Sequence, residues 1–445
     1  MNKRIADHRD FARAPQHRTP SFRIAQLDRL AAAIADHRES IISALASDLG
    51  KPEMEVYASE IGPVMREIAF ARRRVRRWMR PTRAGRGRRV LSAPYGAALI
   101  IGTWNYPFQL TLSPLVAAIA AGNGVTVKPS EAVPESAAVL DRMLSDAFAP
   151  DAVSVVQGDA TISAELVDSG YDKVFFTGSS RIGAVVAAAA AAHHSDVTLE
   201  LGGKSPAIVG PGTDLAFAAN RIAWGKSINA GQTCMAPDYL LVPAEHADAM
   251  VGLVEAAFES FFGSDPRLSP DYGRIVNLHH FDRLADLIDR EGLSVPTRRD
   301  ECYIAPAAFR ATDESAFMDE EIFGPILPVL AYRTFEELEA IVARNPNPLA
   351  SYVFTRDRAF EGAVLHTIPS GGAMVNDVVL HAVEPRIPFG GVGSSGTGSY
   401  HGRFGFETFS NRKGVVRVRQ GRTGSLRFPP YRPLPPLMRR WLFGV

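Results

Sequence analysis

Residues 199–206 read Leu-Glu-Leu-Gly-Gly-Lys-Ser-Pro, and residues 231–235 read Gly-Gln-Thr-Cys-Met. The first stretch places Glu200 where an apolar strand passes into a glycine-containing loop. The second stretch contains Cys234, one of only two cysteines among 445 residues. Each stretch therefore places a reactive side chain next to a loop.

A third stretch, Gly-Thr-Trp-Asn-Tyr-Pro-Phe at residues 102–108, places Asn105 after another apolar strand. Taken singly, a lone cysteine is more often a small buried side chain, a glutamate is usually solvated, and an asparagine at a strand end usually forms a turn. Taken together, a thiol can attack a carbonyl, a carboxylate can activate water, and an amide can donate to an oxyanion. These are three of the parts needed to oxidise an aldehyde through a thioester.

The composition is that of a globular chain long enough for two or more domains. The net charge of +1 gives no global attraction to nucleic acid. Cys234 and Cys302 are too few for a disulfide framework and fit a reducing cytoplasm. Because the chain also lacks a signal-peptide core and an apolar run of about 18 residues, we expect a cytoplasmic protein without a transmembrane segment. The histidines lack metal-ligand spacing, so no metal is expected.

Residues 90–194 alternate between short apolar runs and helical stretches. With the run that follows them, the apolar runs are 97–102, 125–128, 153–157, 173–177 and 197–201. Such alternation predicts a mostly parallel sheet with helices on both faces and ligands at the carboxyl ends of its strands. The side chains that follow these runs include Asn105, Lys128, Gly178 and Glu200. We therefore expect them to face one shared crevice.

Helical patterns precede this sheet. Apolar residues at three- and four-residue steps predict one helix over residues 21–49, ending at Gly50, and a second over about 54–79. The arginine-rich run at 72–89 has the charge to bind nucleic acid or an anionic membrane. It lacks interleaved aromatics apart from Trp78, so a solvated helix end and linker is the favoured interpretation.

The stretches around Glu200 and Cys234 resemble the two signature segments of the aldehyde dehydrogenase superfamily. The resemblance covers about residues 20–430 and includes Thr-Trp-Asn-Tyr-Pro-Phe (103–108), Val-Lys-Pro-Ser-Glu (127–131), Glu-Glu-Ile-Phe-Gly-Pro (320–325) and Pro-Phe-Gly-Gly-Val-Gly (388–393). Three further stretches are similar to the class 3 branch, which includes dehydrogenases of fatty, aromatic and coniferyl-type aldehydes. They are Ser-Tyr-His-Gly (399–402), Phe-Glu-Thr-Phe-Ser (406–410) and Leu-Arg-Phe-Pro-Pro (426–430).

This resemblance implies an α/β fold of the aldehyde dehydrogenase type, with a Rossmann-type cofactor domain, an α/β catalytic domain and a small oligomerisation segment. The NAD(P)-binding domain is expected over residues 1–201 and the catalytic domain over 202–380. A C-terminal segment, 381–445, is expected to close the crevice. Its strand near 415–418 and a hairpin over 85–100 are expected to join two subunits into a homodimer. The proline-rich tail after residue 410 disfavours a long helix.

The resemblance also implies NAD or NADP as the cofactor. Residues 175–183, Phe-Phe-Thr-Gly-Ser-Ser-Arg-Ile-Gly, follow a strand and open a helix, a context that holds a pyrophosphate, although the stretch is not G-x-G-x-x-G. Ser180 departs from the family pattern but can still cap the helix. The expected cofactor-binding residues are Trp104, Lys128, Ser130, Glu131, Gly178, Ser179, Gly183, Leu201, Glu321 and Phe323.

The choice between NAD and NADP stays open. Glu131 repels a 2′-phosphate on the adenine ribose, whereas Lys128 attracts it. Arg181 either helps to tolerate NADP or is an ordinary surface arginine.

In the chemistry that the resemblance implies, Cys234 attacks the aldehyde, Asn105 and the Cys234 backbone N–H hold the oxyanion, and Glu200 activates the water that releases the acid. Lys204 supports either Glu200 or the Gly202-Gly203 turn. The candidate substrate-pocket residues are Tyr106, Leu110, Trp224 and Phe389, which suit medium or long aliphatic aldehydes or aromatic ones. Leu110 and Trp224 also fit a plain helix core.

Two other functions remain open at this point. A CoA-acylating enzyme of the same fold would release an acyl-CoA, but such relatives generally lack a base at the position of Glu200. A binding protein would use the basic arm at 72–89 on nucleic acid or membrane. In a weaker version of this binding hypothesis, the protein is an enzyme, and its tail at 439–443 makes a peripheral contact with a membrane.

Overall fold

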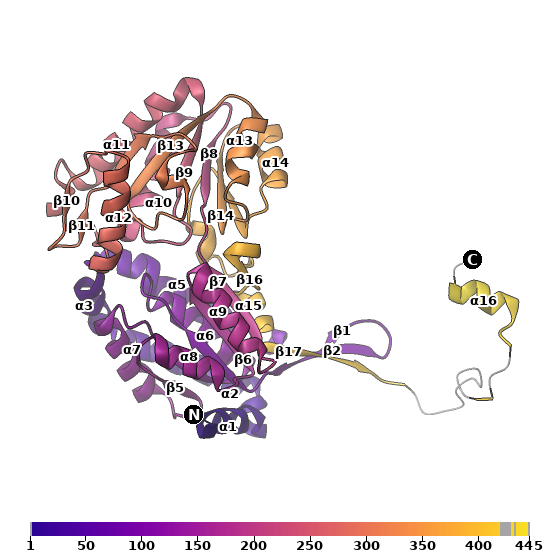
Figure 1. Ribbon diagram of the computed structural model, residues 1–445. Helices are drawn as coiled ribbons and strands as arrows, with labels where there is room; N and C mark the ends of the chain where they lie inside the picture. Colours follow the sequence, from indigo (N-terminus) through magenta and orange to yellow (C-terminus); the bar gives the residue numbers. More distant parts are fainter. Residues whose placement is uncertain (1, 419–428, 431–432, 444–445) are drawn as a thin grey trace.

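Two six-stranded sheets organise the chain, one in each lobe of Figure 1. The computed structural model describes residues 2–418, 429–430 and 433–443. The first sheet consists of β3 (Ala97–Ile101), β4 (Gly124–Lys128), β5 (Val153–Val155), β6 (Lys173–Gly178), β7 (Asp196–Leu201) and β16 (Gly396–Thr397). Their order is β16-β7-β6-β3-β4-β5, and every pair is parallel except β16 with β7. The predicted parallel sheet is confirmed.

Alternation along β3 explains why helices cover both faces of this sheet. Ala98 and Ile100 point to one face, and Leu99 and Ile101 to the other, because successive strand side chains point in opposite directions. The first face packs against α2 (Pro20–Asp36), α3 (Arg38–Leu49), α5 (Gly62–Trp78), α6 (Gln109–Ala121) and α7 (Pro134–Ala147). The second packs against α1 (Asn2–Arg13), α8 (Ala160–Asp168) and α9 (Ser180–Ala191). Since both faces are buried, β3 is apolar at every position.

The second sheet is parallel throughout. Its strands are β8 (Pro206–Val209), β9 (Tyr239–Pro243), β12 (Ala307–Arg310), β13 (Ile326–Tyr332), β14 (Ala350–Phe354) and β15 (Gly372–Val375). They follow the order β12-β13-β9-β8-β14-β15. One face packs against α10 (Leu215–Ser227) and α11 (Ala247–Phe262), and the other against α13 (Phe335–Ala343) and α14 (Arg358–Thr367). In a smaller apolar cluster, α12 (Leu278–Arg290) packs against β11 (Tyr303–Ile304). β11 in turn pairs with β10 (Thr297–Arg298).

The hairpin expected over residues 85–100 forms instead over residues 82–94. β1 (Thr82–Arg83) and β2 (Arg88–Pro94) form the hairpin, and β2 also pairs along its length with β17 (Ser410–Val416). These three strands form the arm that extends from the lower lobe in Figure 1. Residues 97–101 belong instead to the central strand β3, because they are buried on both faces.

The helix expected over residues 21–49 is two helices. α2 ends at Asp36, and α3 begins at Arg38. His37 lies between them with φ −99° and ψ 11°, and its ring nitrogen contacts the Ala33 carbonyl at 2.9 Å. No buried side chain occurs between Ile34 and Ile41 to continue the packing face across this junction. The predicted stop at Gly50 is confirmed, because this residue adopts the left-handed conformation at the end of α3.

The second expected helix, over residues 54–79, is continuous but changes its winding. A short α4 (Glu53–Glu55) leads into a π-helical turn, η2 (Val56–Ile61), before α5. π turns often occur at functional sites, since they place side chains off the regular α-helical spacing. Near the C-terminus, α15 (Gly402–Thr408) precedes β17, and a short α16 (Pro436–Phe443) follows. None of the helices within the described ranges has the length and apolar character needed to cross a membrane.

Candidate active site

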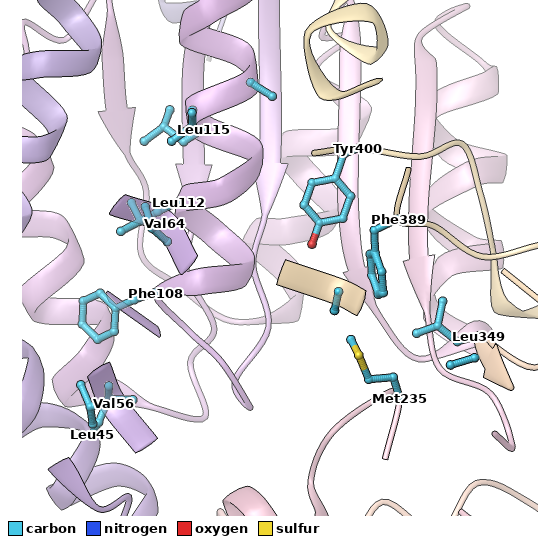
Figure 2. Close-up of a cluster of buried hydrophobic side chains, with 14 of the residues drawn as sticks. Leu45, Val56, Val64, Phe108, Leu112, Leu115, Met235, Leu349, Phe389 and Tyr400 are labelled. Carbon is cyan, nitrogen blue, oxygen red and sulfur yellow. The ribbon is translucent and has the colours of Figure 1, made fainter. Parts of the chain in front are cut away.

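Cys234 lies between two cavities and lines both of them. Leu110 and Phe389 also line both cavities. One cavity, of about 520 Å³, contains Glu200, Asn105 and the first residues of α9, and is called the crevice below. The other is an apolar cavity lined mainly by α4, η2, α10 and residues 379–383. Figure 2 shows that Tyr400, Phe389 and Met235 lie close together beside this boundary. The thiol therefore faces two chemically different spaces.

The loop that carries Cys234 has an unusual backbone. Asn229, Ala230 and Gly231 have φ values of 50°, 51° and 75°, so three successive residues are left-handed. This conformation is unfavourable for residues other than glycine, so the surrounding contacts must hold the loop. At Gly231 a side chain is also excluded, because a Cβ would lie 2.2 Å from the Gly324 carbonyl oxygen.

Buried amide side chains hold this loop. The Asn229 amide donates to the Asn105 carbonyl at 2.9 Å. The Gln232 amide donates to the Arg274 carbonyl and accepts from the Val276 N–H, each at 2.9 Å. The glutamine in the Gly-Gln-Thr-Cys stretch is therefore a structural brace for the nucleophile loop.

The Cys234 thiol is half-buried. Burial, and then the nearby carboxylates of Glu321 and Glu200, raise its pKa, whereas the backbone N–H groups of Cys234 and Met235 lower it. Burial is the dominant effect, so the thiol is protonated in the ligand-free protein. A proton must therefore leave Sγ as the thiol becomes a nucleophile.

Glu200 supplies a carboxylate at the boundary. It lies on β7, its side chain is buried, and neither carboxylate oxygen has a hydrogen-bond partner among the described residues. This burial raises the pKa of Glu200 well above its usual value. A buried carboxylate without a partner is costly to keep, and it is a strong candidate for accepting and returning protons.

Asn105 lies where the crevice meets the cysteine loop. Its side-chain amide donates one hydrogen bond, to the Gln232 carbonyl at 3.0 Å. A second N–H of the same amide remains for an incoming oxyanion. The main chain at Asn105 is held by Lys51, whose ammonium donates to the Asn105 carbonyl at 3.0 Å.

Lys51 and Glu60 form a fully buried ion pair behind the Asn105 loop, with 2.6 Å between Nζ and Oε1. The other oxygen of Glu60 accepts the N–H groups of Phe108 and Gln109 at the start of α6. This pair therefore connects the loop to the helix that follows it. Neither residue was predicted from the sequence, because neither lies in a motif.

We expect Lys51→Met to destabilise the fold by about 3–5 kcal/mol, because it leaves the Glu60 carboxylate buried and unpaired. The free energy of unfolding in urea measures this change. Lys3→Met is the matched control, since Lys3 is exposed and pairs only with Asp7. Equal unfolding midpoints for the two variants would contradict the proposed importance of the buried pair.

The crevice is lined by six of the ten residues expected to bind the cofactor: Trp104, Gly178, Ser179, Leu201, Glu321 and Phe323. Lys128, Ser130, Glu131 and Gly183 do not line it. Lys128 instead pairs with Glu131 at 2.5 Å at the end of β4. At Gly183 a Cβ would lie 2.5 Å from Leu201, so this glycine permits α9 to pack closely on β7.

Ser179, not Ser180, is the N-cap of α9. Its hydroxyl accepts the Ile182 N–H, whereas the Ser180 hydroxyl donates to the Ser394 carbonyl at 2.9 Å. The cap must precede the first helical residue, and that residue is Ser180. The N-terminal N–H groups of α9 thus point toward the crevice, as anion binding requires.

The segment carrying Glu321 and Phe323 is held by Lys204. Its ammonium donates to Asp238 at 2.6 Å, and to the carbonyls of Phe317 and Glu320. From the sequence, Lys204 could support either Glu200 or the adjacent glycine turn. Its contacts instead hold the loop around residues 317–320, which leads into Glu321 and Phe323.

Aromatic rings and basic side chains complete the crevice. Phe323 lies edge-on to Trp104, with 5.2 Å between ring centroids, and has a φ of 50°. His280 and Arg283, on α12, also line the crevice and were not identified from the sequence. Burial lowers the pKa of His280 to about 4, so its ring is neutral at physiological pH.

The apolar cavity is lined by all four candidate pocket residues: Tyr106, Leu110, Trp224 and Phe389. The Tyr106 hydroxyl is already paired with Thr233, 2.6 Å away. The other apolar lining residues were not identified from the sequence: Met54, Ala58, Ile228, Met235, Val379, Leu380, Ala382, Val383 and Tyr400. All except Met235 and Tyr400 lie outside the motifs. Within the described ranges, no group of His, Cys, Asp and Glu side chains is arranged to hold a metal ion.

Comparisons with known proteins agree with this geometry. The model of the aldehyde dehydrogenase family matches residues 2–415. The chain is 38% identical to 4,4′-diaponeurosporen-aldehyde dehydrogenase of Staphylococcus aureus, over 97% of both chains. It is 39% identical to the dimeric NADP-preferring aldehyde dehydrogenase of Mus musculus, over 95% of this chain and 96% of that one.

Solved structures are similar along nearly the whole chain. The substrate-bound Staphylococcus aureus AldH superposes with a TM-score of 0.92 at 37% identity, covering 99% of this chain and 98% of that chain. An aldehyde dehydrogenase C mutant of Pseudomonas syringae, in complex with NAD+ and octanal, superposes with a TM-score of 0.85 at 28% identity. It covers 94% of this chain and 89% of that chain.

Proposed function

The chain belongs to the aldehyde dehydrogenase family, and we propose that it works through a thioester on Cys234, with Asn105 as oxyanion donor and Glu200 as general base. The protein oxidises an aldehyde to a carboxylic acid with NAD or NADP. One observation carries the proposal for the residues. Cys234 is the shared wall of an apolar cavity and a crevice that contains a buried, unpaired carboxylate.

The crevice has groups that fit a dinucleotide. The N-terminus of α9 offers N–H groups to a pyrophosphate, and Ser179 caps that helix. Glu321 offers a carboxylate to ribose hydroxyls, and Trp104 and Phe323 offer ring surfaces. When bound, NAD or NADP supplies the oxidant, taking the aldehyde hydrogen and two electrons onto its nicotinamide ring.

Cys234, Asn105 and Glu200 have separate roles in the proposed reaction. The Cys234 thiol gives its proton to water in the crevice, Sγ forms a bond to the carbonyl carbon, and the carbonyl π electrons move to oxygen. The free N–H of Asn105 and the Cys234 backbone N–H donate to this oxyanion. Oxidation at the same carbon leaves a thioester on Sγ. Glu200 then takes a proton from a water whose oxygen attacks the thioester carbon. The C–S bond breaks, the acid is released, and the proton on Glu200 returns to Sγ.

The apolar cavity favours aldehydes with an apolar body. Tyr106, Trp224 and Phe389 offer aromatic surface, and the remaining wall is largely aliphatic. The octanal in the Pseudomonas syringae complex has this character, and the name of the Staphylococcus aureus relative gives 4,4′-diaponeurosporen-aldehyde as its substrate. Medium or long aliphatic aldehydes and aromatic aldehydes are therefore the proposed substrates.

The CoA-acylating alternative predicts that turnover requires CoA. Glu200 argues against it, because a general base releases the free acid without CoA. We expect the protein to produce NAD(P)H with hexanal, decanal or benzaldehyde in the absence of CoA. The absorbance of NAD(P)H measures this turnover. Turnover that appears only after CoA is added would favour the alternative.

Arg181 lines the crevice at the start of α9 and is exposed. If its guanidinium pairs with a 2′-phosphate, Arg181→Ala lowers kcat/KM for NADP by about tenfold and leaves the value for NAD within about twofold. Steady-state kinetics with both cofactors measure this ratio, and Arg86→Ala, in the hairpin arm, is the control. An unchanged NADP/NAD ratio in Arg181→Ala would leave Arg181 as an ordinary surface residue.

We further propose a cytoplasmic homodimer with the predicted division into cofactor domain, catalytic domain and closing C-terminal segment. The arm formed by β1, β2 and β17 projects from the body and supports this assembly, as does the name of the dimeric mouse relative. Sedimentation of the full chain tests the oligomeric state, and a monomer would contradict it. Loss of lipid-vesicle binding on removal of residues 433–445 would support the peripheral membrane contact considered for the tail.

A further inference from the structure

Glu55 is the one carboxylate among the described residues that line the apolar cavity. It lies at the end of α4, directly before the π turn, and this turn also places Ala58 and Ser59 on the wall. The neighbouring Met54 is 75% exposed, and Trp224, across the cavity, is 36% exposed. Glu55 therefore lies near the mouth, and Cys234 is half-buried at the boundary with the crevice.

The Glu55 side chain is held in place by the nucleophile loop. Its Oε2 accepts the Asn229 N–H at 2.9 Å. Oε1 has no hydrogen-bond partner within residues 2–418, 429–430 and 433–443. Lys51 is nearby, but its ammonium is engaged by Glu60 and the Asn105 carbonyl. One carboxylate oxygen is thus anchored, and the other is left for a ligand.

The surroundings of Glu55 make this free oxygen unusual. Burial, with a smaller contribution from Asp271, raises the pKa of Glu55 to about 7, although Lys51 and the Asn229 N–H act against this rise. Two of the other polar groups on the wall are already engaged. The Tyr106 hydroxyl pairs with Thr233, and the Ser59 hydroxyl donates to the Glu55 carbonyl at 2.6 Å. A carboxylate oxygen in such an apolar wall is stabilised by an incoming hydrogen-bond donor.

We propose that Glu55 forms a polar subsite near the mouth of the cavity that accepts a hydrogen bond from a hydroxyl at the far end of the aldehyde. The inference rests on the proposed function and narrows its substrate class to apolar aldehydes with a distal hydroxyl. When Glu55 is ionised, Oε1 is the acceptor for the hydroxyl. In the neutral form Oε2 still accepts the Asn229 N–H, so Oε1 carries the proton and no longer offers this acceptor. The preference for the hydroxyl is therefore expected to strengthen as the pH rises and Glu55 loses its proton.

The test compares matched aldehydes in Glu55→Gln and the wild type. Hexanal, octanal and decanal are each paired with the ω-hydroxy aldehyde of the same length. The glutamine oxygen can still accept the Asn229 N–H, while its NH₂ group faces the cavity in place of Oε1. At the length that reaches Glu55, we expect the wild type to prefer the hydroxy aldehyde by about tenfold in kcat/KM.

In Glu55→Gln we expect this preference to fall to about twofold or less; the preference is a ratio of two aldehydes in one protein, so it is read independently of any change in kcat/KM for the plain alkanal. Glu53→Gln is the matched control, because Glu53 is an exposed carboxylate of the same short helix and does not line the cavity. An equal preference in Glu55→Gln and wild type, or no preference at any length in the wild type, would overturn the inference. So would an equal loss for both aldehydes, since Glu55 would then act only on the loop.

Binding of octanoate and 8-hydroxyoctanoate by calorimetry separates this inference from the proposed function. A wild-type preference for the hydroxy acid that is lost in Glu55→Gln supports the subsite even if no aldehyde is turned over. In that case only the proposed function fails. Turnover of plain aldehydes without any preference for the hydroxy acid would overturn the subsite alone.

Discussion

Cys234→Ala is expected to reduce the turnover of every aldehyde by about 10⁴-fold or more, since it removes the thiol that we propose forms the covalent intermediate. Cofactor binding should persist, because the groups that fit the dinucleotide come from α9 and from the loop carrying Glu321 and Phe323. NAD(P)H formation and NAD binding by fluorescence measure the two effects. Alanine fits the loop, so the unfolding temperature should change little.

Cys302→Ala is the control for this variant. Cys302 is a partly buried thiol in the turn before β11 and does not line either cavity at Cys234. Its replacement should leave kcat/KM unchanged within about twofold. Comparable activity in Cys234→Ala and wild type would contradict the covalent account.

Glu200→Gln is expected to separate the two halves of the reaction. Because the glutamine cannot accept a proton from water, steady-state turnover should fall by about 10²–10⁴-fold. Oxidation of the Cys234 adduct does not require this base, so rapid mixing should still show a burst of NAD(P)H of about one per active site. Loss of the burst together with turnover would place Glu200 in the first half of the reaction.

The pH dependence follows from the burial of Glu200. A general base acts only when ionised, and burial raises the pKa of this carboxyl group. Deacylation-limited turnover in the wild type should therefore rise with increasing pH as Glu200 loses its proton. This acid limb should disappear from the residual activity of Glu200→Gln. An identical pH profile in both proteins would assign the limb to another group.

The strands next to the motifs could be predicted from the sequence, because in each of them an apolar run lies directly beside a polar or reactive residue. β3, β4, β6 and β7 are buried along most of their length, so each appears as a mainly apolar run next to a motif. β8, β12 and β15 were not identified, since each is four residues long and has weak local pattern. The break at His37 and the pairing of β2 with β17 depend on tertiary contacts that local spacing does not encode.

The catalytic candidates could be proposed from the sequence because they lie in motifs. The residues that hold these candidates in place could not. Glu200 and Cys234 lie in distinctive stretches, and the structure places both on the crevice wall. Lys51 and Glu55 lie in Lys-Pro-Glu-Met-Glu, which has no distinctive chemical pattern. Their importance arises from partners far along the chain, such as Asn105 and Asn229.

Mass spectrometry of a trapped intermediate shows directly whether Cys234 carries the acyl group. Glu200→Gln would be mixed with decanal and NAD, quenched in acid and digested. We expect a decanoyl group on the peptide containing Cys234, sensitive to hydroxylamine and formed in proportion to NADH. NADH formation with the acyl group on the Cys302 peptide, or with no acylated peptide, would contradict it.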